Sequence, residues 1–210
     1  MAGSGDLDQL QTEIDRLKQQ NEKLRASNRR WMRIAGTDDL TGLPNKVFFS
    51  TALLPQVISQ HNAEERGFVG IMVAPDNLGE INQKYGREGG DQTVTRLADY
   101  LKENIEPDEK LVHIDGANFV IIVPQADETM ARRRTRQIRA KMVSRHFDCG
   151  GDVVSLTLSM GVVVQPPDPQ GTEIKVKEIS EDLLKRMGIA LDQAKKEGGD
   201  RVVEDFAVEE

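Results

Sequence analysis

The stretch HIDGANFVII, residues 113–122, has the pattern of two strands joined by a tight turn. Asp115-Gly116 is a hairpin turn signal between β-forming residues. A hairpin that served phosphoryl chemistry would carry acidic residues at its tip, because hard divalent metals prefer carboxylate oxygens. The tip here holds Ala117 and Asn118. Two interpretations therefore stay open, a plain hairpin and an active site whose chemistry has been removed.

The remaining reactive residue types do not suggest another site. The histidines at positions 61, 113 and 146 are scattered and lack the spacing of metal ligands. Cys149 is the only cysteine, which excludes both a disulfide within the chain and a cysteine-based metal cluster. No paired base marks it as a nucleophile. We therefore expect neither a bound metal nor a cofactor.

The composition indicates a single polar domain with a helical extension. The chain has 210 residues, of which 38% are hydrophobic and 30% charged. Its net charge of -7 argues against nucleic-acid binding. The sequence contains neither an apolar run of the roughly 18 residues that a membrane span needs nor an apolar signal region near its N-terminus. We expect a cytoplasmic protein without membrane insertion.

Residues 6–35 carry a heptad pattern with regular steps of three and four between the a and d positions. Leucine at d combined with asparagine at a favours a parallel two-stranded coiled coil. The alternative is a single helix folded back on the domain, whose apolar stripe would be wider. We predict a homodimeric coil that Gly36 ends. Its a and d residues are Leu7, Leu10, Ile14, Leu17, Asn21, Leu24, Asn28 and Trp31.

Residues 37–205 alternate between helical and strand patterns, which predicts an α/β domain with a mixed central sheet flanked by helices. The expected helices cover 46–61, 78–85, 90–104, 128–147 and 180–196. The expected strands are 68–73, the hairpin 111–123, the segment 153–164 and a last strand at 201–203, with a proline-rich loop at 166–172.

Four segments of this domain resemble motifs of the GGDEF domain, the diguanylate cyclase fold. They are DDLTGLPNK at 38–46, APDNLGEINQKYGREGGD at 74–91, LSMGVVV at 158–164 and ALDQAKKEGGDRVV at 190–203. Their order and spacing also agree with the family. The resemblance implies a nucleotide-cyclase-like fold, and it aligns the five signature positions with Asp115, Gly116, Ala117, Asn118 and Phe119.

The same resemblance implies that the catalytic chemistry is missing. Active relatives join two GTP molecules with the help of divalent metals. The family positions that supply metal-binding carboxylates hold Ala74 and Ala117 here, and the next signature acid is Asn118. Asp76 remains, but one carboxylate makes a poor two-metal site. Further departures from the family pattern are Gly79, Gln83, Arg87 and Gly199. We expect an inactive, degenerate domain with no catalytic residues.

Some nucleotide-binding positions of the family persist. Asn82 and Asp91 match the residues that read the guanine edge, and Lys195 matches a phosphate-contacting lysine. The structural alternative is that Asn82 and Asp91 cap helices and that Lys195 is a solvated charge. Many relatives also bind their product, cyclic di-GMP, at an Arg-x-x-Asp motif. Glu106 and Glu109 stand there, and because their charge has the wrong sign we do not expect that ligand.

The segment ARRRTRQIRAKMVSR, residues 131–145, predicts a basic helix in an acidic protein. We interpret it as a solvated face balanced by neighbouring acids, with an acidic partner-binding face as the alternative. The residues predicted to be buried are Ile138, Met142, Val143 and Phe147. Those predicted to point outward are Arg132, Arg133, Arg136 and Arg139.

The sequence as a whole favours a dimeric, non-catalytic signalling protein that acts as a scaffold or regulator for a protein partner. By resemblance to the family it is bacterial. One alternative is a receptor that binds GTP through Asn82, Asp91 and Lys195. A second alternative is a cyclase with altered metal chemistry that uses Asp76.

Overall fold

The computed structural model describes residues 4–143, 145–149, 152–168 and 173–206, and within these ranges the side chains at 4–9, 25–26, 28–34, 148–149 and 173–175 are not described. The elements in chain order are α1 (Ser4–Ala35), α2 (Lys46–Phe48), the π-helical turn η1 (Phe49–Leu53), α3 (Leu54–Ala63), β1 (Phe68–Pro75), α4 (Leu78–Asn104), β2 (Lys110–Asp115), β3 (Asn118–Val123), α5 (Glu128–Val143), β4 (His146–Cys149), β5 (Asp152–Ser155), β6 (Leu158–Gln165), α6 (Glu173–Lys196) and β7 (Val202–Asp205).

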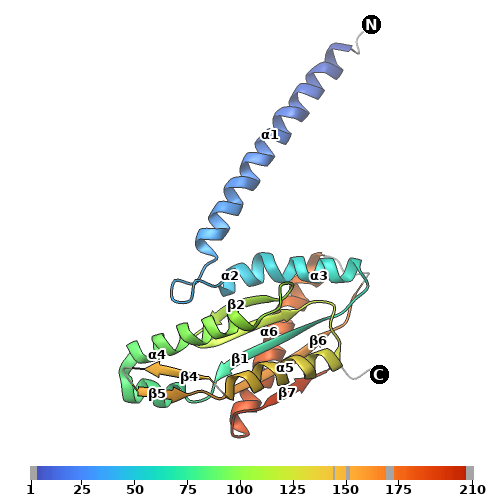
Figure 1. Ribbon diagram of the computed structural model, residues 1–210. Coiled ribbons are helices and arrows are strands. Elements are labelled where there is room, and N and C mark those ends of the chain that lie inside the picture. The colour runs from blue at the N-terminus through green and yellow to red at the C-terminus, as the bar shows by residue number, and fades with distance from the viewer. Residues whose placement is uncertain (1–3, 144, 150–151, 169–172, 207–210) are drawn as a thin grey trace.

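The main sheet has the strand order β2-β3-β1-β6-β7. Its pairs are antiparallel except for β6 and β7, which are parallel. Helices α4 and α5 pack on one face, and α3 and α6 pack on the other (Figure 1). Strands β4 and β5 form a separate two-stranded ribbon. The predicted mixed sheet flanked by helices is confirmed.

Strand β1 is buried along its whole length because helices cover both of its faces. Val69, Ile71 and Val73 point into the core under α4 and α5, whereas Met72 and Ala74 point into the core under α3 and α6. A strand buried on both faces needs apolar residues at every position. This explains the unbroken apolar run FVGIMVAP.

The predicted helix 128–147 is wrong at its C-terminal end. Helix α5 ends at Val143, which is 77% exposed, and Phe147 is buried on strand β4 instead. The segment leaves the helix because β4 pairs with β5 in an antiparallel ribbon. For the same reason the predicted strand segment 153–164 is divided between β5 and β6, which belong to different sheets.

Helix α6 begins at Glu173 and not near Ser180, so it starts directly after the predicted proline-rich loop 166–172. Residues 169–172 of that loop lie outside the described residues. The predicted helix 46–61 consists of α2, η1 and α3. Pro55 lies in the first turn of α3, where its missing N–H is tolerated. The predicted helices 78–85 and 90–104 are the two arms of α4, which Gly86 separates with a φ of 70°.

Helix α1 ends at Ala35, as predicted, and projects away from the domain (Figure 1). Its described apolar stripe, formed by Leu10, Ile14, Leu17 and Leu24, is between 44% and 61% exposed. The side chains of the other predicted seam residues Leu7, Asn28 and Trp31 lie outside the described part. No helix among the described residues is long and apolar enough to cross a membrane.

The junction between α1 and the domain is fixed by Asn45. Its Nδ2 donates to the carbonyl oxygen of Ala35 at 2.8 Å, and its backbone N–H donates to that of Gly36 at 2.7 Å. These bonds satisfy carbonyl groups at the end of α1 that have no partner within the helix. Asn45 therefore ties the helix directly to the start of the domain.

Gly161 allows α6 to pack against the sheet, and it yields a stability prediction. A Cβ at this position would lie 2.2 Å from the carbonyl oxygen of Met187 and 2.4 Å from the nitrogen of Leu191, which are backbone atoms. We expect Gly161→Ala to lower the free energy of unfolding by roughly 1–3 kcal/mol. Urea denaturation measures this value.

Gly188→Ala in α6 is the matched control, because a Cβ there meets no atom within 4 Å. Alanine has the higher helix propensity, so this variant should be as stable as the parent or more stable by up to about 1 kcal/mol. Equal stability of the Gly161 and Gly188 variants would contradict the close approach of α6 to β6.

Candidate functional site

The hairpin of β2 and β3 is confirmed, but its turn lies one position later than predicted. Asp115 is the last residue of β2, and the turn consists of Gly116 and Ala117. Gly116 has a φ of 52°, a value that favours glycine. Asn118 Nδ2 donates to Asp115 Oδ1 at 2.7 Å. The polar groups of the tip thus bind one another.

A histidine holds the base of this hairpin. His113 is buried, with Nδ1 2.9 Å from Asp38 Oδ1 and Nε2 3.0 Å from the carbonyl oxygen of Gly116. Its ring stacks on Phe119 with a centroid separation of 4.9 Å. Both ring nitrogens thus face oxygen atoms, one of the loop after α1 and one of the hairpin turn. His113 lacks the spacing of a metal ligand in the sequence, but its place beside the signature residues is a usable signal for this structural role.

Asp38 connects the hairpin to the loop after α1. Burial alone would raise the pKa of the Asp38 carboxyl, but hydrogen bonds from the hydroxyl and N–H of Thr41 and from His113 outweigh it and hold that pKa below its usual value. Thr41 Oγ1 and N lie 2.7 and 2.8 Å from Asp38 Oδ1. The opening motif of the domain therefore positions the signature hairpin.

The two positions that would supply metal-binding carboxylates face apolar surroundings. Ala74 is completely buried in the core under α3 and α6, and Ala117 is 9% exposed and packs in the other core. Methyl groups cannot ligate a metal ion. In the part of the chain that the structure describes, no group of three or more His, Cys, Asp or Glu side chains is arranged so that it could hold a metal ion. The residues present therefore do not fit a two-metal site.

Asp76 is the acidic residue that remains near Ala74, and its carboxylate connects several segments of the chain by hydrogen bonds. Its carboxylate accepts hydrogen bonds from Thr157 Oγ1 at 2.6 Å, Ser159 Oγ at 2.5 Å and the backbone N–H of Asp200 at 2.9 Å. A Cβ at Gly199 would lie 2.8 Å from its Cγ. Asp76 thus joins the end of β1 to β6 and to the loop before β7, and both carboxylate oxygens are occupied.

Asn82 and Asp91 lie on opposite sides of the break in α4. Asn82 Oδ1 lies against Gly90, where a Cβ would be only 1.8 Å away. The suggestion that these residues cap helices is wrong, because both lie inside α4. Asp91 Oδ2 is 3.8 Å from Arg87 Nε, and the exposed Asn82 amide makes no hydrogen bond with the described residues. The pair has the polar groups that a guanine edge needs.

Lys195 lies elsewhere, in a cavity of about 290 Å³ beside the signature hairpin. Lys46, Asp115 and Asp192 contribute the other charges of its wall, and neither Asn82 nor Asp91 lines it. Two lysines and two aspartates give this cavity no net charge. The electrostatic attraction between this cavity and a triphosphate would therefore be weak. The structure therefore does not combine the three predicted nucleotide-binding residues into one cavity.

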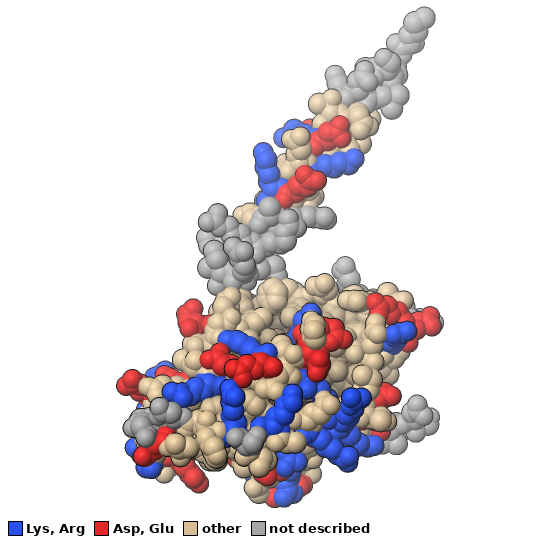
Figure 2. Space-filling view, viewed as in Figure 1, with Lys and Arg blue, Asp and Glu red and all other residues tan. Residues whose placement is uncertain are grey.

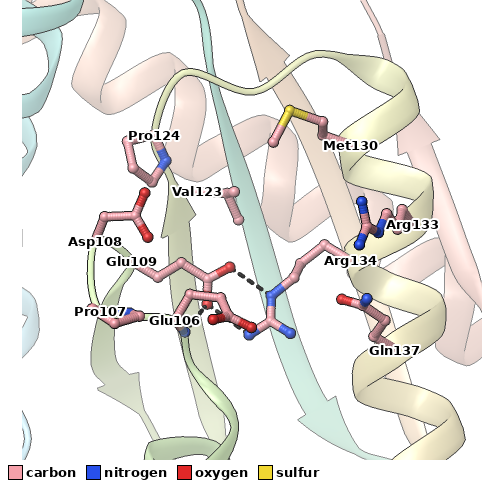
Figure 3. A pocket seen from close by; sticks show the side chains of 10 residues that line it. All are labelled: Glu106, Pro107, Asp108, Glu109, Val123, Pro124, Met130, Arg133, Arg134 and Gln137. Carbon is pink, nitrogen blue, oxygen red and sulfur yellow. Dashed lines mark hydrogen bonds and ion pairs between the residues drawn. The ribbon is translucent and has the colours of Figure 1, made fainter.

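A larger hollow, of about 410 Å³, lies at the positions aligned with the product-binding motif (Figure 3). Glu109 and Arg134 form a buried bidentate ion pair in its wall, with Nε–Oε1 and Nη2–Oε2 distances of 2.5 and 2.6 Å. Arg134 Nη2 also donates to the carbonyl oxygen of Asn104, and the N–H of Glu106 donates to Glu109 Oε2 at 2.9 Å. These groups satisfy one another.

Arg134 was not among the residues predicted to be buried, although it is 6% exposed. The signal was the helical period, since Arg134 lies on the same face of α5 as the buried residues Ala131 and Ile138. A buried guanidinium on such a face requires a carboxylate partner. Only the folded arrangement identifies that partner as Glu109.

Comparisons with known proteins identify the family and the fold. The family profile described as "Diguanylate cyclase, GGDEF domain" matches residues 35–201. The diguanylate cyclase DgcP of Pseudomonas aeruginosa is 25% identical over 199 residues, which cover 95% of this chain and 28% of that protein. The response regulator PleD of Caulobacter vibrioides is 26% identical over 196 residues, covering 92% of this chain and 41% of the regulator. The chain spans less than half the length of these relatives.

Solved structures show the same fold. The coiled coil and GGDEF domain of DgcB from Caulobacter crescentus, in complex with c-di-GMP, has a TM-score of 0.71 at 21% identity, covering 93% of this chain and 99% of that chain. The diguanylate cyclase SiaD of Pseudomonas aeruginosa, in complex with its activator SiaC, has a TM-score of 0.69 at 21% identity, covering 96% and 74%.

The buried pair yields a prediction about stability. Glu109→Ala leaves the guanidinium of Arg134 buried without its carboxylate, so we expect the free energy of unfolding to fall by roughly 3–5 kcal/mol. The double variant Glu109→Leu/Arg134→Met removes both charges and should recover most of this loss. Urea denaturation compares the two. A loss below about 1 kcal/mol for Glu109→Ala would mean that the pair behaves as a surface ion pair.

Proposed function

This chain belongs to the GGDEF domain family, and from that premise we propose that it serves cyclic di-GMP signalling without catalysis, as a dimeric scaffold or regulator of a protein partner. The observation that carries the proposal is the state of Asp76. Its two oxygens accept three hydrogen bonds from Thr157, Ser159 and Asp200. An ionised carboxylate has about four lone-pair sites, so these hydrogen bonds leave at most one of them for a metal ion.

The neighbouring positions support the same conclusion. Two-metal phosphoryl transfer needs several carboxylate oxygens around the ions. Ala74 and Ala117 offer none, and the Asn118 amide is engaged with Asp115. Gly199 stands where relatives carry a basic residue, and any side chain there would collide with Asp76. Reversion of a single residue would therefore not rebuild the site.

The dimer is proposed from α1. A stripe of four leucine and isoleucine side chains, each at least 44% exposed, is unfavourable on an isolated helix in water. A second copy of the chain buries this stripe and pairs Asn21 with its own counterpart. The similar DgcB structure contains a coiled coil next to its GGDEF domain. Since Asn45 ties α1 to the domain, the coil also holds two domains in a defined relation.

A guanine-nucleotide receptor is the second candidate, and the free amide of Asn82 together with Asp91 favours it. Against it stands the neutral cavity around Lys195, which lies apart from that pair. An enzyme with altered metal chemistry would have to use Asp76, whose hydrogen bonds oppose this role.

Calorimetry separates the scaffold from the receptor. We expect titration of GTP into the dimer, with or without Mg²⁺, to give no saturable heat at millimolar concentration, because charge and metal ligands are missing. Micromolar binding that Asn82→Ala/Asp91→Ala abolishes, and that Gln92→Ala on the same helix leaves intact, would establish the receptor instead. A rise in affinity with Mg²⁺ would show that the metal site persists.

Light scattering tests the dimer. Leu17→Asp places a charge in the seam, so we expect the dimer to dissociate to a monomer whose domain stays folded. Gln19→Asp introduces the same charge on the outer side of α1 and should leave the dimer intact. A Leu17 variant that remains dimeric would refute the coiled coil.

A further inference from the structure

We propose that the outer face of α5, together with the hollow beside it, binds an acidic segment of a partner protein that also carries an apolar anchor residue. This inference deepens the proposed function, since it names the surface and the chemistry of the partner. The recognition elements are the side chains of Arg133 and Arg136 and the apolar wall around Met130.

Arg133 and Arg136 are exposed and have no carboxylate partner among the described residues. Four other arginines in or next to α5 do have a carboxylate partner. The predicted neutralisation of this helix by neighbouring acidic residues therefore holds for those four arginines only. Their pairs are Arg132 with Glu204, Arg134 with Glu109, Arg139 with Asp200 and Arg145 with Glu103. Two adjacent guanidinium groups thus stay unpaired although the chain has a net charge of -7. They are available to carboxylates from outside.

The two arginines form one recognition unit. They are three residues apart on α5, which brings their side chains to the same face of the helix. With Thr129, Arg132 and Gln137 they line a hollow of about 420 Å³. Figure 2 shows Lys and Arg side chains gathered over α5. A guanidinium binds a carboxylate through two parallel hydrogen bonds, so this unit fits two neighbouring acidic side chains.

An apolar site lies directly beside the arginines. The second hollow, of about 410 Å³, is lined by Met130, which is 45% exposed, and by Val123 and Pro124. Figure 3 shows Met130 and Pro124 on opposite sides of its upper end. Arg133 and Gln137 line both hollows, which makes them one continuous surface. Methionine and arginine are enriched at protein interfaces, and an apolar side chain fits here.

The opposite wall sets the direction of the bound segment. Glu106 and Asp108 are exposed on the loop before β2 and repel acidic groups, so the carboxylates of the partner lie on the α5 side. The buried Arg134–Glu109 pair joins the two walls and keeps the surface rigid. Because the chain as a whole repels polyanions, a short acidic protein segment fits better than a nucleic acid.

Selection from a displayed library of random short peptides on the immobilised dimer tests the proposal. We expect the enriched peptides to combine neighbouring Asp or Glu residues with a large apolar residue. A synthetic copy of the most enriched peptide should then bind at least about tenfold more weakly to Arg133→Glu/Arg136→Glu and to Met130→Glu, as measured by fluorescence anisotropy. The variants should keep the circular dichroism of the parent, because all three side chains are exposed.

The matched control is Arg96→Glu/Lys185→Glu, which makes the same change in net charge. Arg96 on α4 and Lys185 on α6 are also exposed and unpaired among the described residues, so this variant should keep the affinity of the parent for the peptide. Equal weakening by the control would reduce the effect to general electrostatics and overturn the site.

Three results would overturn the inference: no enrichment of acidic peptides, enriched peptides that ignore the α5 substitutions, or a cyclic dinucleotide or single-stranded RNA that binds with the same arginine dependence. The last of these results would mean that the arginines recognise phosphate groups and not carboxylates. These outcomes are independent of catalysis. Turnover of GTP would refute the proposed function alone, whereas a failed selection would refute this surface alone.

Discussion

Every residue of β1, from Phe68 to Pro75, is buried between two layers of helices, and this constraint determines what the end of the strand can do. In a catalytic relative this strand must present a carboxylate to metal ions at the edge of the core. Here Ala74 continues the apolar packing, and an ionised group in its place would require compensation that the surrounding side chains do not offer. In the proposed account, apolar packing at Ala74 takes the place of a charged metal ligand.

The residues around Asp76 are consistent with this account because they engage its carboxylate in structural hydrogen bonds. Thr157 and Ser159 on β6 and the backbone of Asp200 hold its carboxylate, and Gly199 gives it the necessary space. At the positions aligned with the product-binding motif of the family, Glu109 and Arg134 likewise neutralise each other inside the wall. Both regions contribute stability, whereas α1 carries an exposed apolar stripe and α5 carries two arginines without a carboxylate partner among the described residues. This distribution suits a protein that acts through its surfaces.

Much of the fold could be predicted from the sequence because its signals are local. The apolar run of β1, the hairpin at 111–123 and the end of α1 before Gly36 each follow from short patterns. Strand β4 could not be predicted, since its pairing with β5 overrides a helical pattern that continues through Phe147. The roles of Arg134, His113 and Asp76 depend on partners 25 to 124 residues away in the chain, as in the pairs with Glu109 and Asp200. The residue types alone predicted the absence of metal ligands, but they did not predict the apolar packing of Ala74 and Ala117 or the hydrogen bonds of Asp76.

The most direct test of the central claim is a product assay on the purified dimer. The chain is incubated with GTP and either Mg²⁺ or Mn²⁺, and cyclic di-GMP is measured by mass spectrometry against a sample without protein. We predict no product above that background with either metal ion. Formation of cyclic di-GMP that depends on the metal and disappears in Asp76→Ala would contradict the account, because it would show that Asp76 can leave its hydrogen bonds and serve as a metal ligand.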